Sequence, residues 1–173
     1  DRVPEAFDLS DKITIQPGEY LNTTGSLRYS TPQVNLTTLS SSLKIGTFYN
    51  GNLISTSISP ELIFSKYFQM SGSYEYNYID FPDLNKTFHA HVGRLSLASS
   101  LNVKLSFSAF AQINSLHNIS TLNFRLRYNS ADGNDLYLVY NEMLNNKPLL
   151  KIPQLPSSDI RAILIKYIYT IKR

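Results

Sequence analysis

Two histidines, His89 and His91, lie two residues apart in the segment "TFHAHVGRLS". In an extended strand this spacing points both imidazoles to one face, where they could hold a metal ion or act as a catalytic pair. A metal site needs a third ligand and a catalytic base needs an orienting carboxylate, and no Asp/Glu cluster at a fixed spacing supplies either. We therefore expect a structural role for both histidines, with no catalytic residue, no metal site and no cofactor.

Charged residues also stand in segments where polar and apolar residues alternate. Arg125 and Arg127 take every second position of "LNFRLRYN", and Lys44 and Glu75 are placed similarly in their own segments. We add Arg94 to these charged candidates, although it lies on the opposite face of its strand from the two histidines. In a barrel, such side chains either bind an anionic or sugar ligand or form the polar network that fills the lumen, and we favour the network. The predicted polar residues of the lumen are Lys44, Glu75, His89, His91, Arg94, Arg125 and Arg127.

Period-two alternation runs through most of the chain and predicts an all-β fold. Turn-forming residues separate the strands, and Asn50-Gly51 is the strongest signal for a two-residue hairpin. Most strands have about ten or more residues, which is enough to cross a bilayer at a tilt. We expect strands near residues 19–30, 34–49, 53–64, 67–80, 87–99, 103–116, 119–129, 135–143 and 160–172, with a short extra strand at 13–16.

One face of these strands is apolar, and the environment of that face decides between two classes of protein. In a soluble lipocalin-like binding barrel the apolar residues line the interior, whereas in a membrane barrel they meet lipid and the polar residues line the lumen. Long strands with faces rich in Ser, Thr and Asn favour an antiparallel transmembrane β-barrel. The predicted lipid-facing residues are Phe68, Met70, Tyr74, Tyr76, Tyr78, Leu105, Phe107, Leu122, Phe124, Leu126, Ile163, Ile165, Tyr167 and Tyr169.

The composition fits one domain without disulfides and without a nucleic-acid partner. The chain has 173 residues, no Cys, and a net charge of +3 from scattered basic residues. Its best candidate for a transmembrane helix, residues 162–171, has about half the required length and is broken by Lys166. Twelve tyrosines suit strands that meet a membrane interface.

Several segments, taken in order, are similar to one known family. They are "ITIQPGEY" at 13–20, "SLRYST" at 26–31, "GTFYNGN" at 46–52, "YEYNYIDFP" at 74–82, "RLSL" at 94–97, "LRYNSADGNDLYLVYNE" at 126–142 and "LIKYIYTIKR" at 164–173. Together they resemble the C-terminal barrel region of outer-membrane proteins that carry an N-terminal family-9-type carbohydrate-binding domain. The resemblance implies a membrane-embedded barrel in the outer membrane of a Gram-negative bacterium, and it implies no reaction. The resemblance begins at residue 13 and does not extend to the carbohydrate-binding domain or to the first part of the family's barrel.

Strand counting extends this expectation to the domain organisation. Nine strands counted back from a periplasmic C-terminus leave residues 1–18 on the outer side, as an outer loop or an extra short strand, and residues 19–173 as the barrel segment. A complete barrel begins in the periplasm, so we expect about nine or ten strands from the C-terminal part of a larger barrel. The two edge strands should then meet other strands of the same protein or other envelope subunits. Residues near Leu27 and Ile165 should lie far apart, without ladder hydrogen bonds between them.

The expected function is non-enzymatic. The chain would be an outer-membrane scaffold, or a component of transport or surface assembly linked to glycan handling or protein export, with membrane lipid as a partner. One alternative is an outer-membrane hydrolase that uses His89 or His91. The other alternative is the soluble lipocalin-like binding barrel.

Overall fold

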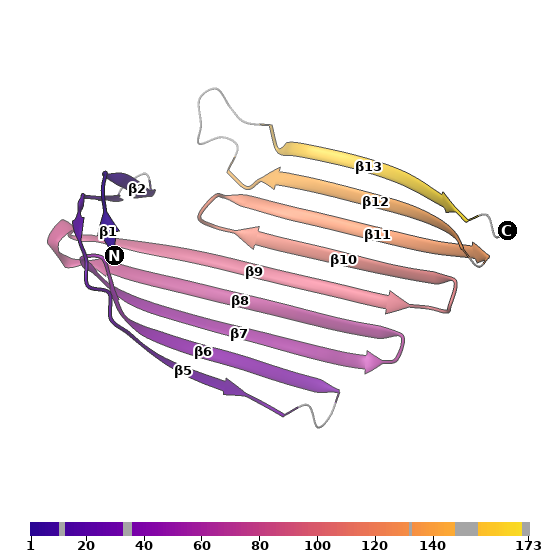
Figure 1. Ribbon diagram of the computed structural model, residues 1–173, viewed down its shortest axis with the longest axis horizontal. Coiled ribbons are helices and arrows are strands. Elements are labelled where there is room, and N and C mark those ends of the chain that lie inside the picture. Colours follow the sequence, from indigo (N-terminus) through magenta and orange to yellow (C-terminus); the bar gives the residue numbers. More distant parts are fainter. Residues whose placement is uncertain (11–12, 33–35, 132, 148–155, 171–173) are drawn as a thin grey trace.

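The computed structural model describes residues 1–10, 13–32, 36–131, 133–147 and 156–170, and it consists mainly of β-strands (Figure 1). These residues contain no α-helix, and a single 3-10 turn is present at Pro82–Leu84. The predicted all-β antiparallel fold is confirmed. The nine strands of the large sheet are β5 (Thr24–Ser30), β6 (Thr37–Phe48), β7 (Gly51–Ser65), β8 (Phe68–Phe81), β9 (Lys86–Ser100), β10 (Leu105–Asn114), β11 (Ile119–Ala131), β12 (Asn134–Asn145) and β13 (Ser158–Tyr169).

The large sheet is an open meander in which each strand pairs with the next one in the chain. β9 lies at its centre, and β5 and β13 form its two edges. Within the described residues, β5 pairs with β6 alone and β13 pairs with β12 alone, so Leu27 and Ile165 belong to opposite edges. The expectation that these nine strands do not close on one another is confirmed.

Most strands fall within three residues of their predicted ranges, but the first is shorter than predicted. It begins at Thr24 rather than at residue 19, because β4 (Gly18–Glu19) pairs with β1 (Arg2–Val3) instead. Asp1 and Tyr20 then exchange two hydrogen bonds of 2.8 Å through their main-chain groups. Residues 18–20, which would have extended β5, therefore pair with the N-terminal segment instead. The predicted end of the last strand, at 171–172, lies outside the described residues.

Two short ribbons form a cap at one end of the large sheet. One is the β1–β4 pair, and the other joins β2 (Phe7–Ser10) to β3 (Ile13–Ile15). Figure 1 shows the cap beside the end where the β8–β9 hairpin turns. Residues 1–18, predicted as an outer loop or one extra strand, therefore contain a strand at Ile13–Ile15, within the predicted range 13–16, and further strands that were not predicted.

The cap encloses the buried core of the protein. Ile13 and Phe81 are each 1% exposed, which makes them the most deeply buried large side chains in the described part of the chain. The core packs cap residues against the ends of β7 and β8, and its members are Val3, Ile13, Ile15, Leu53, Ile79 and Phe81. Most of the sheet lies beyond the reach of this core.

The hairpin between β6 and β7 is displaced by one residue from its predicted position. Phe48 pairs with Gly51, so the turn residues are Tyr49 and Asn50 rather than Asn50 and Gly51, and Tyr49 has a positive φ of 53°. Gly51 instead begins β7, where a Cβ atom would lie 2.8 Å from the Cγ2 atom of Ile79. The glycine therefore permits close packing beneath the cap.

Cross-strand register divides the sheet into two chemically different faces, because residues paired across an antiparallel ladder project to the same side. We define the apolar face as the side of Met70, Leu95 and Leu126, and the polar face as the opposite side. All fourteen residues predicted to face lipid share the apolar face: Phe68, Met70, Tyr74, Tyr76, Tyr78, Leu105, Phe107, Leu122, Phe124, Leu126, Ile163, Ile165, Tyr167 and Tyr169. The cap packs on the polar face, since Leu53, Ile79 and Phe81 project there.

Gly46→Ala is expected to loosen edge strand β5. A Cβ atom at Gly46 would lie 2.1 Å from the Thr23 carbonyl oxygen and 2.6 Å from the Thr24 Cα, so the β5 backbone would have to move. We expect a loss of about 1–3 kcal/mol in the free energy of unfolding, with faster hydrogen exchange in residues 24–30. Gly25→Ala is the control, because its Cβ would meet the Ile45 carbonyl oxygen at 3.9 Å. Equal effects of the two substitutions would contradict the close approach.

Candidate functional site

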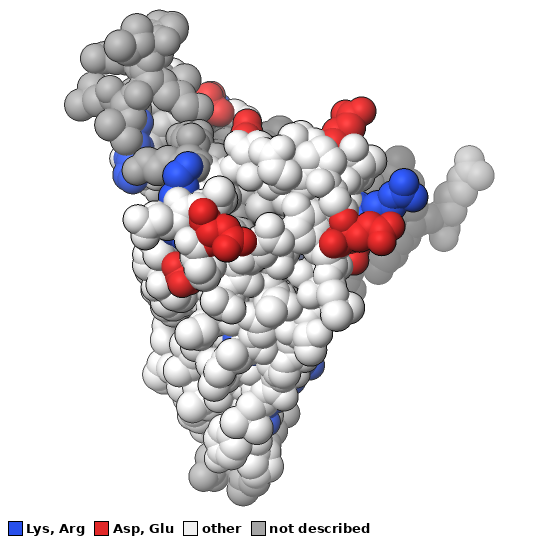
Figure 2. All heavy atoms as spheres, turned by 90° about the vertical axis from the view of Figure 1, so that its left-hand side faces the viewer, with Lys and Arg blue, Asp and Glu red and all other residues white. Residues whose placement is uncertain are grey.

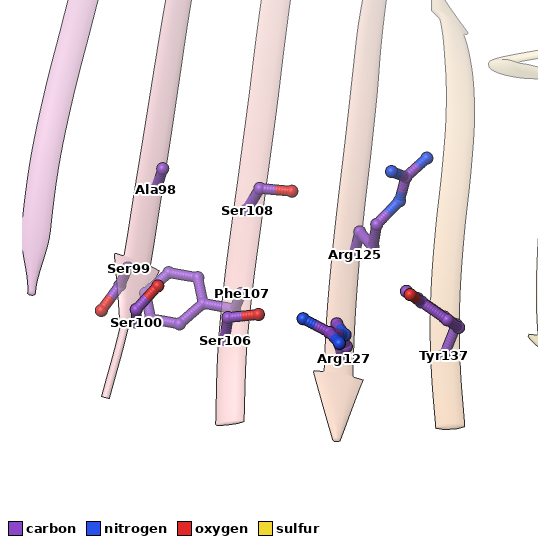
Figure 3. Close-up of a pocket in the computed structure, with 9 residues that line it drawn as sticks. All are labelled: Ala98, Ser99, Ser100, Ser106, Phe107, Ser108, Arg125, Arg127 and Tyr137. Carbon is purple, nitrogen blue, oxygen red and sulfur yellow. The ribbon is translucent and has the colours of Figure 1, made fainter. Parts of the chain in front are cut away.

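The polar face carries a groove around two arginines of β11 (Figure 3). Alternation along β11 places Arg125 and Arg127 on this face, opposite Ser108 and Ser106 of β10, and Arg127 also pairs with Tyr137 of β12. Serine side chains are short, so they leave space beside the long guanidinium groups. The resulting cavity has a volume of about 380 Å³, and Ala98 and Ser100 also line it. Ser99 and Phe107 contribute to the lining although they belong to the apolar face.

The two arginines differ in their partners. Arg127 donates from Nε to the Asp135 carboxylate at 2.9 Å, and Asn129 donates to the same Asp135 oxygen at 3.0 Å. Arg125 is exposed and forms no ion pair with any described residue. The pair therefore presents one guanidinium that is anchored and one that is available to a ligand.

Three lysines extend this positive charge into adjoining cavities. Lys66 and Lys104 line a cavity of about 580 Å³ that shares Arg127 with the first. Lys166 lines another, of about 450 Å³, that shares Arg125. We call Lys66, Lys104, Arg125, Arg127 and Lys166 the basic groove. Sequence reasoning did not select the lysines, because they come from two separate turns and the last strand, and only the meander topology brings them to the same end of the sheet.

The remaining polar candidates share this face but lie on other strands. Lys44 pairs with Ser55 on β7, and Glu75 accepts a hydrogen bond of 2.8 Å from the Asn77 side chain. Arg94 donates to the Gln112 side chain at 3.0 Å. These residues are spread over β6, β8 and β9, so they do not join the basic groove into one cluster.

The grouping of His89 and His91 with Glu75 was wrong. His91 pairs with Tyr76 and His89 pairs with Tyr78, so both histidines project from the apolar face, opposite Glu75. Alternation along β9 shows that the two histidines share a face, but it does not reveal how β9 is registered against β8. The backbone hydrogen bonds between β8 and β9 fix that register, and in it the two histidines lie on the same face as the tyrosines.

The histidines and tyrosines form a ladder of hydrogen bonds and ring contacts. The hydroxyl of Tyr74 lies 2.7 Å from Nδ1 of His91, and the hydroxyl of Tyr76 lies 2.8 Å from Nδ1 of His89. Ring centroids are 4.8 Å apart for Tyr76 and His91 and 5.0 Å apart for Tyr78 and His89. Within the described residues, no group of three or more His, Cys, Asp or Glu side chains could hold a metal ion. This arrangement suits an aromatic surface more than a catalytic base.

A second polar cluster on the apolar face was not predicted. Glu142 is 8% exposed, and its Oε1 accepts two hydrogen bonds from Arg161 at 2.9 and 2.6 Å. The Tyr140 hydroxyl donates to the other oxygen at 2.6 Å. The sequence did indicate the face of Glu142, because in "LYLVYNE" it continues the alternation of Leu136, Leu138 and Tyr140. Its pairing with Arg161 could not be predicted, because it depends on the register between β12 and β13.

Fold and site together define the class: an all-β chain whose open, nine-stranded antiparallel sheet has one apolar face and one polar face with a basic groove. No family model, no curated protein and no solved structure matches the chain. The described residues include no helix that is long and apolar enough to cross a membrane.

Proposed function

We propose that the nine-stranded sheet is a wall segment of a transmembrane β-barrel in the outer membrane of a Gram-negative bacterium. Its apolar face would contact lipid, and its polar face would line a water-filled lumen. The observation that carries the proposal is the uncovered apolar face: on inner strands, Tyr74 is 46% exposed, Leu95 43% and Leu136 40%. A soluble monomer rarely exposes an apolar patch larger than a few hundred Å². Lipid would satisfy this face without a second protein layer.

Strand length supports the same proposal. Strands β6 to β13 have 10 to 15 residues each. A tilted strand needs about 9–11 residues to cross the hydrocarbon region. Every one of these strands is therefore long enough to span it.

The distribution of aromatic residues on the apolar face is a further argument. On β8, the tyrosines 74, 76 and 78 lie toward the cap end, Phe68 lies at the opposite end, and Met70 and Gly72 lie between them. Tyr167 and Tyr169 occupy the end of β13 that is far from the cap. Transmembrane barrels carry aromatic girdles at both membrane interfaces with aliphatic residues between them.

An open edge within lipid would be costly, since each unpaired backbone group there costs several kcal/mol. The proposal therefore requires that β5 and β13 pair with strands outside residues 24–169. Because nine strands alternate in direction, β5 and β13 run the same way. An entirely antiparallel barrel would need an odd number of added strands between them. Strands of the same protein or of another envelope subunit would meet this requirement.

In this proposal the chain acts as a membrane scaffold or as a component of transport or surface assembly, linked to glycan handling or protein export. Neither alternative is favoured by a specific contact. A hydrolase would need a carboxylate to orient its histidine base, whereas the hydrogen bonds of His89 and His91 go to the hydroxyls of Tyr76 and Tyr74, and no described carboxylate is bonded to either imidazole. A lipocalin-like barrel would need its apolar face enclosed, and the nine described strands of the sheet leave it open.

The membrane proposal is tested by asking what solvent the full chain requires. We expect the chain to need detergent to stay monodisperse, to show β-sheet circular dichroism there, and to float with phosphatidylcholine vesicles after detergent removal. A matched soluble β-protein, taken through the same procedure, should remain at the bottom of the gradient. Recovery of this chain as a folded monomer in detergent-free buffer, by sedimentation velocity, would overturn the proposal.

A further inference from the structure

We propose that the basic groove is a binding site for a multiply charged oxyanion, a phosphate or sulfate group that is either free or esterified to a larger solute. This goes beyond the proposed function and takes from it only the condition that the polar face meets water. The site lies where β9 to β13 approach the end of the sheet opposite the cap. Its proposed ligating groups are the guanidiniums of Arg125 and Arg127, with hydroxyls around them (Figure 3). The three lysines line the adjoining cavities.

The balance of charge is the first argument. The groove contains five cationic side chains, and the carboxylate in contact with it among the described residues is Asp135, which engages Arg127. Arg125, Lys104 and Lys166 form no ion pairs within the described residues. A cluster of like charges around shared cavities is repulsive unless an anion neutralises it. A single carboxylate would leave most of this charge uncompensated, whereas a phosphate or sulfate carries more charge on one centre.

The donor geometry is the second argument. Arg125 and Arg127 stand two residues apart on one strand, which separates their Cα atoms by about 7 Å. Both line the same cavity, and their guanidinium groups diverge from β11: Arg127 turns toward Ser106 on β10, and Arg125 turns toward β12, which also carries the Tyr137 hydroxyl. Guanidinium groups bind phosphate oxygens through two parallel N–H donors, and neighbouring hydroxyls can satisfy the remaining oxygens.

Cavity size fits a small anionic ligand. The cavity around the arginines has a volume of about 380 Å³, and the adjoining one around Lys66 and Lys104 has about 580 Å³. Both values fall in the range of about 300–1,000 Å³ that is usual for small-molecule sites. Because the cavities share Arg127, a phosphate ester could place its anion at the arginines and its remaining part beside the lysines.

Charge is also separated along the strands. Carboxylates gather at the cap end, where Asp1, Glu5, Asp8, Glu19 and Asp83 belong to the cap or to the β8–β9 turn. Figure 2 looks onto this end and shows acidic side chains across its upper half, with basic side chains at the left and right of them. Arg2 and Lys86 also belong to this end, where the carboxylates outnumber them. The basic groove occupies the opposite end of the same sheet. Such a field repels anions from one end and concentrates them at the other, which favours the groove as their binding position.

The test measures anion binding by the full chain in the solvent that keeps it monodisperse. Isothermal titration calorimetry is run separately with inorganic phosphate, glucose 6-phosphate and acetate. The variant is Arg125→Gln with Arg127→Gln. The control is Arg28→Gln with Lys44→Gln, which removes the same charge from the polar face at the distant strands β5 and β6. We expect the groove variant to bind both phosphates at least tenfold more weakly and the control to bind them as the unchanged chain does.

Each other outcome decides against the site or against part of it. If the unchanged chain did not bind phosphate, the site would be overturned. Equal weakening of phosphate binding in both double variants would also overturn it, because that result would indicate attraction by the overall positive charge rather than by the groove. Acetate binding as tight as phosphate would overturn the assignment to a multiply charged oxyanion. Tighter binding of glucose 6-phosphate than of inorganic phosphate would identify an ester, and the reverse would identify the free ion. Vesicle flotation of the same samples is measured separately. A failure to float would count against the membrane proposal, and a failure to bind phosphate would count against the anion site, so the two results are distinguishable.

Discussion

Phe81→Ala is expected to release the cap from the sheet and to lower the free energy of unfolding by about 3–5 kcal/mol. Phe81 is 1% exposed and packs in the core with Ile13 of the cap and with Leu53 and Ile79 of the sheet. Because this core is the main apolar contact between the two ribbons and the sheet, a cavity at its centre affects every cap residue at once. The chain is then expected to retain its long strands and to lose protection in residues 1–20.

The effect is measured by chemical unfolding together with hydrogen exchange resolved to the N-terminal segment. Phe64→Ala is a matched control, since Phe64 is 57% exposed on β7 and belongs to no buried cluster. It should cost less than about 1 kcal/mol and leave the protection of the cap unchanged. If both variants behaved alike, or if cap protection survived Phe81→Ala, the core would not be what attaches the cap.

Local alternation was sufficient to predict the long strands and most of the face assignments. In β11 the sequence alternates strictly, so Leu122, Phe124 and Leu126 could be separated from Arg125 and Arg127 without coordinates. Such separation needs only the two-residue period of a strand. It is weak in the cap, whose strands have two to four residues: the strand at Ile13–Ile15 was predicted, whereas β1, β2 and β4 were not.

Register between strands was the information that the sequence did not contain. The alternation of β9 shows that His89 and His91 share a face, but it does not say whether that face carries Glu75 or Tyr76. A shift of pairing by one residue reverses the answer. The same limit hid the contact between Glu142 and Arg161, which are 19 residues apart and meet only because β12 and β13 pair at that position.

The basic groove illustrates a further limit. Lys66 and Lys104 stand in different turns, 38 positions apart in the sequence, and each looks like an ordinary solvated turn residue when read alone. A meander returns every second turn to the same end of the sheet, and the lysines therefore line one cavity with Arg127. The spacing of the two lysines along the chain does not indicate that they lie close together, whereas the order of the strands in the sheet does.

Leu95→Arg is expected to be the most disruptive single change on the open part of the sheet. Leu95 lies near the middle of β9, the central strand, and its cross-strand partners on the apolar face are Gly72 and Ala111. If this face meets lipid, an arginine near the bilayer midplane should cost about 2–4 kcal/mol. Ser96→Arg is the control one residue away, because Ser96 faces Ser71 and Phe110 on the polar side.

The two variants are compared by denaturant unfolding in lipid vesicles and by the fraction of chain that floats with them. Ser96→Arg should change stability by less than about 1 kcal/mol, since a cation on the polar face keeps its hydration. Both substitutions add the same charged side chain to the same strand, so the cost of placing the arginine at the two positions compares the solvent on the two sides of the sheet. An equal cost at the two positions would mean that both faces meet the same medium, and the membrane proposal would fail on that result alone.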